Sequence, residues 1–162
     1  MEKRRPYRSL SVIFLILILF LSLTNVSASQ WNVGSGQDYN NIQEAIDNSN
    51  TADGDIINVF NGTYEEDVVV NKNLTIRANN NDTVTLKPTD VAFNIVNDTT
   101  GNGGGTTITG FIINLINGRL GINISANHCT IENNTINGGE KGITTIGTNT
   151  IIKNNKIFGV SN

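Results

Sequence analysis

The sequence predicts an all-β fold, a right-handed single-stranded parallel β-helix (solenoid) with a short N-terminal capping helix. Two observations lead to the parallel solenoid in this prediction. Asparagine and isoleucine are unusually abundant, with 27 and 22 of the 162 residues, and Ile favours strands whereas Asn favours tight turns. From Thr106 onward the chain also repeats itself every 21 to 23 residues, a length expected for one coil of a parallel β-solenoid.

The start of the chain has the pattern of a secretory signal peptide. Basic residues at its beginning precede an apolar run from Leu10 to Leu23, and small residues follow up to Ala28. We therefore assign residues 1–28 to a signal peptide and 29–162 to the β-helix domain. The run is shorter than the ~20 residues that span a bilayer, although an uncleaved signal anchor is the alternative. No second apolar run follows, so we expect no membrane span after signal removal.

The composition of residues 29–162 restricts the partners and the stabilising chemistry. Removal of the signal peptide leaves 7 basic and 13 acidic residues, a formal charge of −6. Nucleic-acid binding needs clustered Lys and Arg, so we expect no nucleic-acid partner. Cys129 is the single cysteine, which excludes an internal disulfide framework and leaves packing and hydrogen bonding to stabilise the domain.

The first predicted element is a short helix from Asn40 to Asn48. Its apolar residues fall on one face: Ile42, Ala45 and Ile46. An asparagine and the residue three places on could form its capping box, either Asn40 with Gln43 or Asn41 with Glu44. A helix this short and one-sided is expected to cover an apolar surface rather than to build a core.

Strands are predicted after a turn at Asp53-Gly54-Asp55. Short apolar runs bounded by turn residues mark them: Ile56–Phe60, Val68–Val70, Leu74–Ile76, Val84–Leu86 and Phe93–Val96. The glycine-rich segment Asp98–Gly105 is predicted to be a loop.

Two independent alignments define the repeat in the second half. Three six-residue segments align with spacings of 23 and 21 residues: Ile108–Ile113, Ile131–Ile136 and Ile152–Ile157. A second pair, Gly121–Ile124 and Gly142–Thr145, is again 21 residues apart. Each segment keeps Ile at alternate positions, so we interpret one repeat as one coil.

Stacked repeats place aligned side chains about 4.8 Å apart along the solenoid axis. Two isoleucine columns should point inward: Ile108, Ile131 and Ile152, and Ile113, Ile136 and Ile157. Cys129 aligns with Thr106 and Thr150 and should be a small core residue. Asparagines should stack at one turn and hydrogen-bond along the axis: Asn133 with Asn154, and Asn134 with Asn155. Opposite charges align in two pairs that we interpret as structural, Glu132 with Lys153 and Arg119 with Glu140.

Four segments resemble the amino-terminal part of the pectin-lyase-like superfamily of right-handed parallel β-helices. They are Asp38–Ile46, Gly54–Val59, Asn61–Glu66 and Asn73–Ile76. In that superfamily a short helix caps the open end of the solenoid and a G-T-Y-x-E turn leads into the first full coils. The later Asn-rich coils resemble the parallel β-helix repeats of archaeal adhesin-like surface proteins. Together the resemblances cover Trp31 to Asn162.

The superfamily includes pectin esterases, pectate lyases and polygalacturonases, so the resemblance raises the question of catalysis. The esterase segment G-x-x-D-F-I-F-G is missing here, as are the N-T-D, D-D and G-H-G segments of polygalacturonases. Lyases cluster acidic residues for Ca²⁺ beside an Arg or Lys that abstracts a proton, whereas the acidic residues here lie in turns or align with a base. We expect no enzyme activity and assign no catalytic, cofactor-binding or metal-binding residue.

Two acidic groups could offer oxygen ligands to a cation. The run Glu65-Glu66-Asp67 lies on the turn that enters the first coil, and we interpret it as a solvated turn. Asp53 and Asp55 flank Gly54, but the remaining spacing of a Ca²⁺ loop is absent, which favours an ordinary turn.

Other candidate groups also have simpler interpretations. His128 and Cys129 could bind a metal or pair as base and nucleophile, but adjacent strand residues point to opposite faces, so we expect a surface histidine beside a core cysteine. Aromatic residues could form a sugar-stacking platform, although most fit core or cap positions: Trp31, Tyr39, Phe60, Tyr64, Phe93, Phe111 and Phe158. Sequons for N-glycosylation begin at seven asparagines, which are Asn25, Asn61, Asn73, Asn81, Asn97, Asn123 and Asn133.

Three functional hypotheses remain. The first is a secreted or cell-surface, adhesin-like scaffold that contacts cell-wall or extracellular glycans or other surface proteins without catalysis and without a cofactor. The second is an N-terminal fragment of a polysaccharide lyase, hydrolase or esterase of the same fold. The third is a β-helix that assists metal-centre maturation, which the single histidine argues against. Because residues 160–162 fall in mid-coil without a polar cap, we expect a fragment, a truncated reading frame or end-to-end association with another copy.

Overall fold

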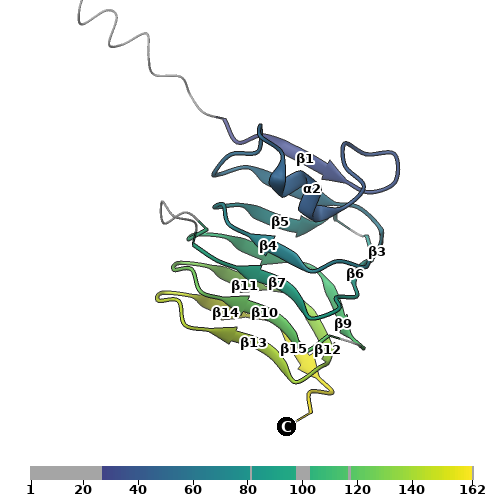
Figure 1. Ribbon diagram of the computed structural model, residues 1–162, viewed down its shortest axis with the longest axis vertical. Helices are drawn as coiled ribbons and strands as arrows, with labels where there is room; N and C mark the ends of the chain where they lie inside the picture. Colours follow the sequence, from purple (N-terminus) through teal and green to yellow (C-terminus); the bar gives the residue numbers. More distant parts are fainter. Residues whose placement is uncertain (1–26, 81, 98–102, 117, 162) are drawn as a thin grey trace, which may run out of the picture.

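The computed structural model describes residues 27–80, 82–97, 103–116 and 118–161. The chain forms an all-β solenoid whose coils stack along one axis (Figure 1). Its strands lie in three sheets, and the strands within each sheet are parallel. The predicted signal peptide lies outside the described residues except for its last two. The predicted loop Asp98–Gly105 lies outside them up to residue 102, and residues 103–105 form a turn.

Each sheet collects one strand from successive coils. Sheet A contains β1 (Gln30–Val33), β2 (Ile56–Val59), β5 (Thr75–Ala78), β8 (Thr107–Thr109), β11 (Thr130–Glu132) and β14 (Ile151–Lys153). Sheet B contains β3 (Gly62–Tyr64), β6 (Val84–Leu86), β9 (Ile112–Leu115), β12 (Thr135–Gly138) and β15 (Lys156–Phe158). Sheet C contains β4 (Val68–Val70), β7 (Val91–Ile95), β10 (Leu120–Ile124) and β13 (Lys141–Thr145). Sheets A, B and C thus form the three sides of the solenoid.

The five predicted strands are present, three of them with bounds shifted by one or two residues. The runs at Val68–Val70 and Val84–Leu86 coincide with β4 and β6, while the other three correspond to β2, β5 and β7. The strands are short because each coil must turn a corner after three to five residues, and Asn, Asp and Gly supply those corners.

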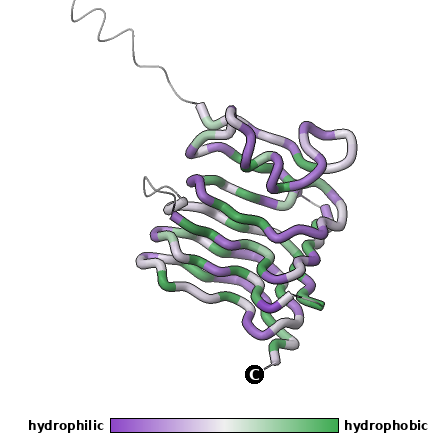
Figure 2. Tube along the Cα trace, in the orientation of Figure 1, coloured by the Kyte–Doolittle hydropathy of each residue, from purple (hydrophilic) through white to green (hydrophobic). Residues whose placement is uncertain are grey.

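The inward columns follow the predicted register. Ile131 pairs with Ile108 and Ile152, and Ile136 with Ile113 and Ile157. All but the last member of each column are fully buried. Ile152 and Ile157 are 45% and 43% exposed, because no described coil follows them. Figure 2 shows that apolar and polar stretches follow one another along each coil.

A column of left-handed residues turns the chain from sheet A to sheet B. Gly110, Asn133 and Asn154 occupy this position in successive coils with φ of 87°, 56° and 57°. Glycine and asparagine adopt this conformation at the lowest cost. The repeated Asn-Asn pairs of the sequence are therefore corners whose first residue is left-handed.

The second asparagine of each corner forms the predicted ladder. Asn134 is buried, and its Nδ2 donates to the Oδ1 of Asn155 across 3.1 Å and to the carbonyl of Ile108 across 3.0 Å. Its Oδ1 accepts from the backbone N–H of Phe111. The ladder thus satisfies backbone groups that the corner takes out of the sheets.

The helix α2 (Ile42–Asp47) lies within the predicted range. Its N-cap is Asn41, whose side chain accepts from the N–H of Glu44 across 2.8 Å, which is one of the two hydrogen bonds of the second predicted capping box. The buried residues Ile42, Ala45 and Ile46 pack toward β1, β2 and β4. Its role as a cap, like the handedness of the solenoid, stays a prediction.

Candidate functional site

An open groove of about 460 Å³ runs over the outer face of sheet C. It crosses β7, β10 and β13 and the turns that lead into them. Its lining is mostly polar: Asp90, Val91, Asn94, Arg119, Leu120, Asn123, Lys141, Thr144, Thr145 and Ile146. Because its walls come from three consecutive coils, the groove exists only when these coils are stacked.

The floor of the groove is a row of hydrogen-bonded side chains. Asn94, Asn123 and Thr144 are register partners on adjacent strands. The Nδ2 of Asn123 donates to the Oδ1 of Asn94, and its Oδ1 accepts from the hydroxyl of Thr144, both across 2.9 Å. An amide nitrogen carries two hydrogens and a hydroxyl oxygen two lone pairs. The row therefore retains donors and acceptors for a bound polar molecule.

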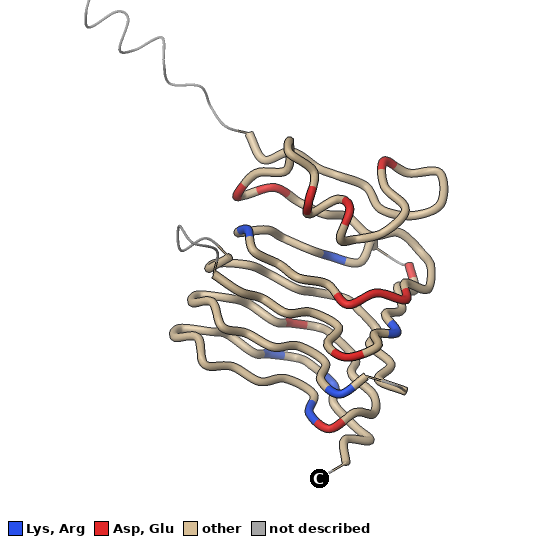
Figure 3. Tube along the Cα trace, viewed as in Figure 1, with Lys and Arg blue, Asp and Glu red and all other residues tan. Residues whose placement is uncertain are grey.

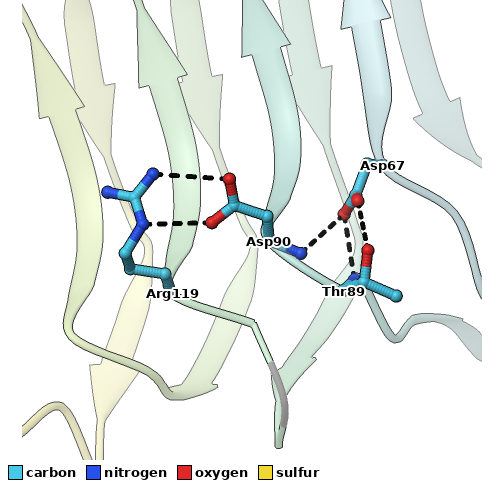
Figure 4. Close-up of polar contacts among 4 residues, drawn as sticks. All are labelled: Asp67, Thr89, Asp90 and Arg119. Atoms are coloured by element: carbon cyan, nitrogen blue, oxygen red, sulfur yellow. Dashed lines mark hydrogen bonds and ion pairs between the residues drawn. The ribbon is translucent and has the colours of Figure 1, made fainter.

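Charged groups line one end of the groove. The guanidinium of Arg119 donates to both carboxylate oxygens of Asp90, across 3.0 and 3.4 Å (Figure 4). This pair raises the pKa of Arg119, mainly through the hydrogen bond to Asp90. The remaining guanidinium donors are not used by Asp90, and Lys141 adds a second cation nearby.

Arg119 and Glu140 align as predicted, but the ion pair of Arg119 is formed with another residue. The backbone N–H of Glu140 donates to the carbonyl of Arg119, so the two residues are neighbours in successive coils as expected. Among the described residues, however, the ion pair of Arg119 is formed with Asp90 in the preceding coil. The other predicted pair is confirmed, with 2.9 Å between Lys153 Nζ and Glu132 Oε2.

The hydrogen bonds around Asp90 also involve Asp67, which lies in the preceding coil. The carboxylate of Asp67 accepts from the backbone N–H groups of Thr89 and Asp90 across 3.0 Å and from the hydroxyl of Thr89 (Figure 4). Burial opposes ionisation of Asp67, but these hydrogen bonds outweigh it and lower its pKa. Asp67 therefore fixes the backbone from which Asp90 reaches Arg119.

The run Glu65-Glu66-Asp67 is not simply a solvated turn. Glu65 is exposed, but the two oxygens of Glu66 accept from the N–H groups of Ile42 and Gln43 across 2.9 and 3.0 Å. Burial raises the pKa of Glu66, and the two hydrogen bonds offset this in part. Two of the three carboxylates thus hold backbone segments together, which sequence spacing did not indicate.

Asp55 is likewise structural. It is buried, and it accepts from the N–H of Ser29, the indole Nε1 of Trp31 and the N–H of Ala52 across 2.7 to 3.0 Å. Burial opposes its ionisation, but the hydrogen bonds lower its pKa overall. Asp53 accepts instead from the N–H of Asn73. The two carboxylates thus bind different segments of the chain.

His128 and Cys129 lie where the sequence predicted, for a different local reason. Cys129 is fully buried and burial raises the pKa of its thiol. His128 is exposed, but it lies in a turn with a φ of 60° rather than on a strand. Its Nε2 lies 3.2 Å from the amide of Asn149 in the next coil. The histidine is therefore at the surface of the solenoid, and the cysteine thiol is inside its core.

Most aromatic residues are structural. Phe93 and Phe111 are fully buried and pack edge to face with ring centroids 5.1 Å apart. Trp31 and Tyr39 form a second edge-to-face pair at 6.1 Å, partly buried against the core. An aromatic platform on the outer face of sheet C is not present among the described residues, since the groove lining contains none.

Acidic and basic residues separate along the axis. Figure 3 shows the acidic residues concentrated in the first coils and the basic residues further along. In the described part of the chain before Lys72, no basic residue occurs. The groove lies in the later coils, so its cations are distant from most of the negative charge.

The 21- to 23-residue repeat does not indicate the groove, because a longer insertion separates its matching residues. Asn94 and Asn123 are 29 residues apart, whereas the recognised period is 21 to 23. The signal was present in the matching segments Ala92-Phe-Asn-Ile95 and Gly121-Ile-Asn-Ile124.

No group of three or more His, Cys, Asp or Glu side chains is arranged to hold a metal ion in the part of the chain that the structure describes. None of the helices in this part of the chain has the length and apolarity needed to cross a membrane.

The chain is similar to a cell surface glycoprotein of Methanothermus fervidus. The two are 33% identical over 137 residues, which cover 76% of this chain and 20% of that protein. The chain thus spans a fifth of the length of this relative. No model of a known protein family matches the chain, and no solved structure does. The resemblance to the pectin-lyase-like superfamily therefore stays a prediction.

Proposed function

We propose that this protein is exported and acts at the cell surface as a β-solenoid scaffold that contacts extracellular glycans through the groove of sheet C, without cleaving them. The observation that carries the proposal is the row formed by Asn94, Asn123 and Thr144. Its members present amide and hydroxyl groups at the strand spacing of about 4.8 Å. Sugar hydroxyls both donate and accept, so they match such a row.

The groove offers two further features that suit a glycan. Ile146 is 85% exposed beside the row and can contact the apolar C–H face of a sugar ring. Arg119 and Lys141 supply charged donors at the other end, and hydrogen bonds from charged donors are stronger than neutral ones. The combination of a few polar groups with an apolar contact is typical of small-molecule sites.

The cell-surface part of the proposal rests on two independent observations. The first residues have the order of a signal peptide, with a basic segment before an apolar run. The relative from Methanothermus fervidus is named a cell surface glycoprotein. An exported scaffold is consistent with both.

The absence of catalysis is part of the proposal. General acid–base hydrolysis of a glycoside requires two carboxyl groups on either side of the scissile bond. Asp90 is the acidic residue in the groove lining, and its oxygens already accept from Arg119. Four further carboxylates accept from backbone N–H groups and are therefore poorly placed to exchange protons with a substrate: Asp53, Asp55, Glu66 and Asp67.

We also propose that the solenoid is right-handed and that α2 covers its amino-terminal end. Parallel crossovers are right-handed in nearly all known folds. The burial of Ile42, Ala45 and Ile46 against the first strands supports the covering role, because an uncovered coil would expose these strands to association.

Binding and cleavage should be measured together on residues 29–162, against neutral and acidic extracellular polysaccharides. Binding without release of reducing ends or unsaturated products is expected. Thr144→Val removes one hydroxyl of the row and should weaken binding by about 0.5–1.5 kcal/mol, roughly two- to twelvefold. The matched control is Thr130→Val, a half-buried threonine on sheet A.

The outcomes separate the hypotheses. Cleavage that persists in the purified domain would overturn the non-catalytic part and require mutation of Asp90 and Lys141. Equal weakening by both threonine substitutions would mean that the groove is not the contact surface. No binding to any polysaccharide would favour a protein partner over a glycan.

A further inference from the structure

We infer that Asn61 and Asn133 are N-glycosylation sites, and that the sequon asparagines Asn73 and Asn123 stay unmodified. This inference rests on the export contained in the proposed function. It adds a modification surface, separate from the groove, that places attached glycans along one corner of the solenoid.

The two proposed sites occupy equivalent positions in different coils. Asn61 lies between β2 and β3, and Asn133 lies between β11 and β12. Both are therefore at the corner where the chain passes from sheet A to sheet B. Their distance in the sequence hides this relationship, which appears only when the coils are stacked.

Both asparagines are accessible in the folded chain. Asn61 and Asn133 are exposed, and their side-chain amides form no hydrogen bond with another described residue. At Asn133 the reason is the corner geometry, because the buried ladder position belongs to Asn134. The side chain before it is left outside the ladder.

Two other sequon asparagines lack this access. The Nδ2 of Asn123 donates to Asn94 and its Oδ1 accepts from Thr144, so its amide is part of the groove floor. Asn73 is half-buried, and its side-chain amide lies beside Gly105. The sequon at Asn97 extends into residues outside the described part, and Asn81 lies outside it.

The modification requires a glycosyl donor that is a lipid-phosphate-linked oligosaccharide, together with a membrane transferase. The asparagine Nδ2 forms a bond to the anomeric carbon of the sugar while the bond from that carbon to the phosphate oxygen breaks. Nδ2 loses one proton, and the lipid phosphate leaves with the electron pair. An amide nitrogen at an exposed corner can enter such a site, whereas one hydrogen-bonded in a sheet row cannot without disrupting the row.

The arrangement leaves the groove open. Sheet C is the third side of the solenoid, and the corner between sheets A and B borders neither its strands nor its row of Asn94, Asn123 and Thr144. Glycans at Asn61 and Asn133 would thus shield two sheets and leave the contact surface free.

The test is site-resolved glycopeptide mass spectrometry of the full chain exported from a host that N-glycosylates its own proteins. Glycan is expected on the peptides that contain Asn61 and Asn133 and not on those that contain Asn73 or Asn123. N61Q and N133Q should each remove one glycan mass. N123Q is the matched control and should remove none.

A second measurement keeps the test independent of export. The folded chain from a host without the transferase is incubated with transferase membranes and the lipid-linked donor, beside an acceptor peptide that contains a sequon. Transfer to Asn123 or Asn73 would overturn the inference, as would unmodified Asn61 and Asn133 while the peptide is glycosylated. Because the unmodified chain can be assayed for polysaccharide binding, failure of this inference is distinguishable from failure of the proposed function.

Discussion

Asn134 lies directly above Asn155, and the Nδ2 of the first donates to the Oδ1 of the second across 3.1 Å. The same buried amide also bonds the backbone of Ile108 and Phe111. One side chain therefore links three successive coils. Regular stacking of coils depends on such links, because each corner removes backbone groups from the sheet ladders.

Asn134→Ala should lower the free energy of unfolding by about 1–3 kcal/mol, since it leaves buried backbone groups without partners. Asn133→Gly is the neighbouring control, because glycine accepts its left-handed φ of 56°. That control should change stability by less than about 0.5 kcal/mol. Urea unfolding of both variants measures the difference, and equal effects would argue against the ladder as a source of stability.

Acid should destabilise the protein through Asp55. Its pKa is lowered in the folded state, so its contribution is fully present above the unfolded pKa of about 3.9 and is lost as the pH falls through the folded value. Asp55→Asn should lower the free energy of unfolding at pH 7. It should also make that free energy depend less on pH between about pH 5 and pH 2. Denaturant midpoints across this range would show it, and a variant as acid-sensitive as the parent would refute the assignment.

Cleavage after Ala28 would turn the N–H of Ser29 into an ammonium group, 2.7 Å from the Oδ1 of Asp55. Charge-assisted hydrogen bonds are roughly twice as strong as neutral ones. The chain that begins at Ser29 with a free amine should therefore be more stable than its Nα-acetylated form, by about 1 kcal/mol. A double-mutant cycle with Asp55→Asn should abolish the difference. A difference that survives this substitution would mean that the amine acts elsewhere.

Glu66 should show the opposite pH dependence. Its pKa is raised by burial, so its favourable contribution is present below the unfolded pKa and is lost as the pH rises through the folded value. The stability of Glu66→Gln relative to the parent should consequently improve between about pH 4 and pH 7. Unfolding curves at several pH values test this, and a relative stability that declines over the range would contradict it.

Two ion pairs at the protein surface allow stability and binding to be separated. Arg119 pairs with Asp90 at the groove, and Lys153 pairs with Glu132 on sheet A. Arg119→Ala and Lys153→Ala should each lower the free energy of unfolding by about 1 kcal/mol at most. Only the first should weaken polysaccharide binding, because only Arg119 lines the groove. Titration of both variants with the same polysaccharide measures this. Weaker binding by Lys153→Ala would indicate that the contact surface lies on sheet A.

Repeated residues made most of the fold predictable. The isoleucine columns, the inward Cys129, the ladder of Asn134 with Asn155 and the pair of Glu132 with Lys153 all follow from one alignment. Such features depend on residues one period apart, and a fixed period is visible in sequence. The ion-pair partner of Arg119, Asp90, was not predicted, because Asp90 lies across an insertion that breaks the period.

The sequence by itself determined the class of fold, the parallel pairing of strands in successive coils and most of the side chains that fill the core. Strand alternation and the coil period are local properties of the chain. The tertiary structure decided which polar residues meet. Asp55 with Trp31, Glu66 with the start of α2, and Asn94 with Asn123 are each brought together by the stacking of coils. Hydrogen bonds act over about 3 Å, so partners separated by irregular loops are fixed only when the coils are in register.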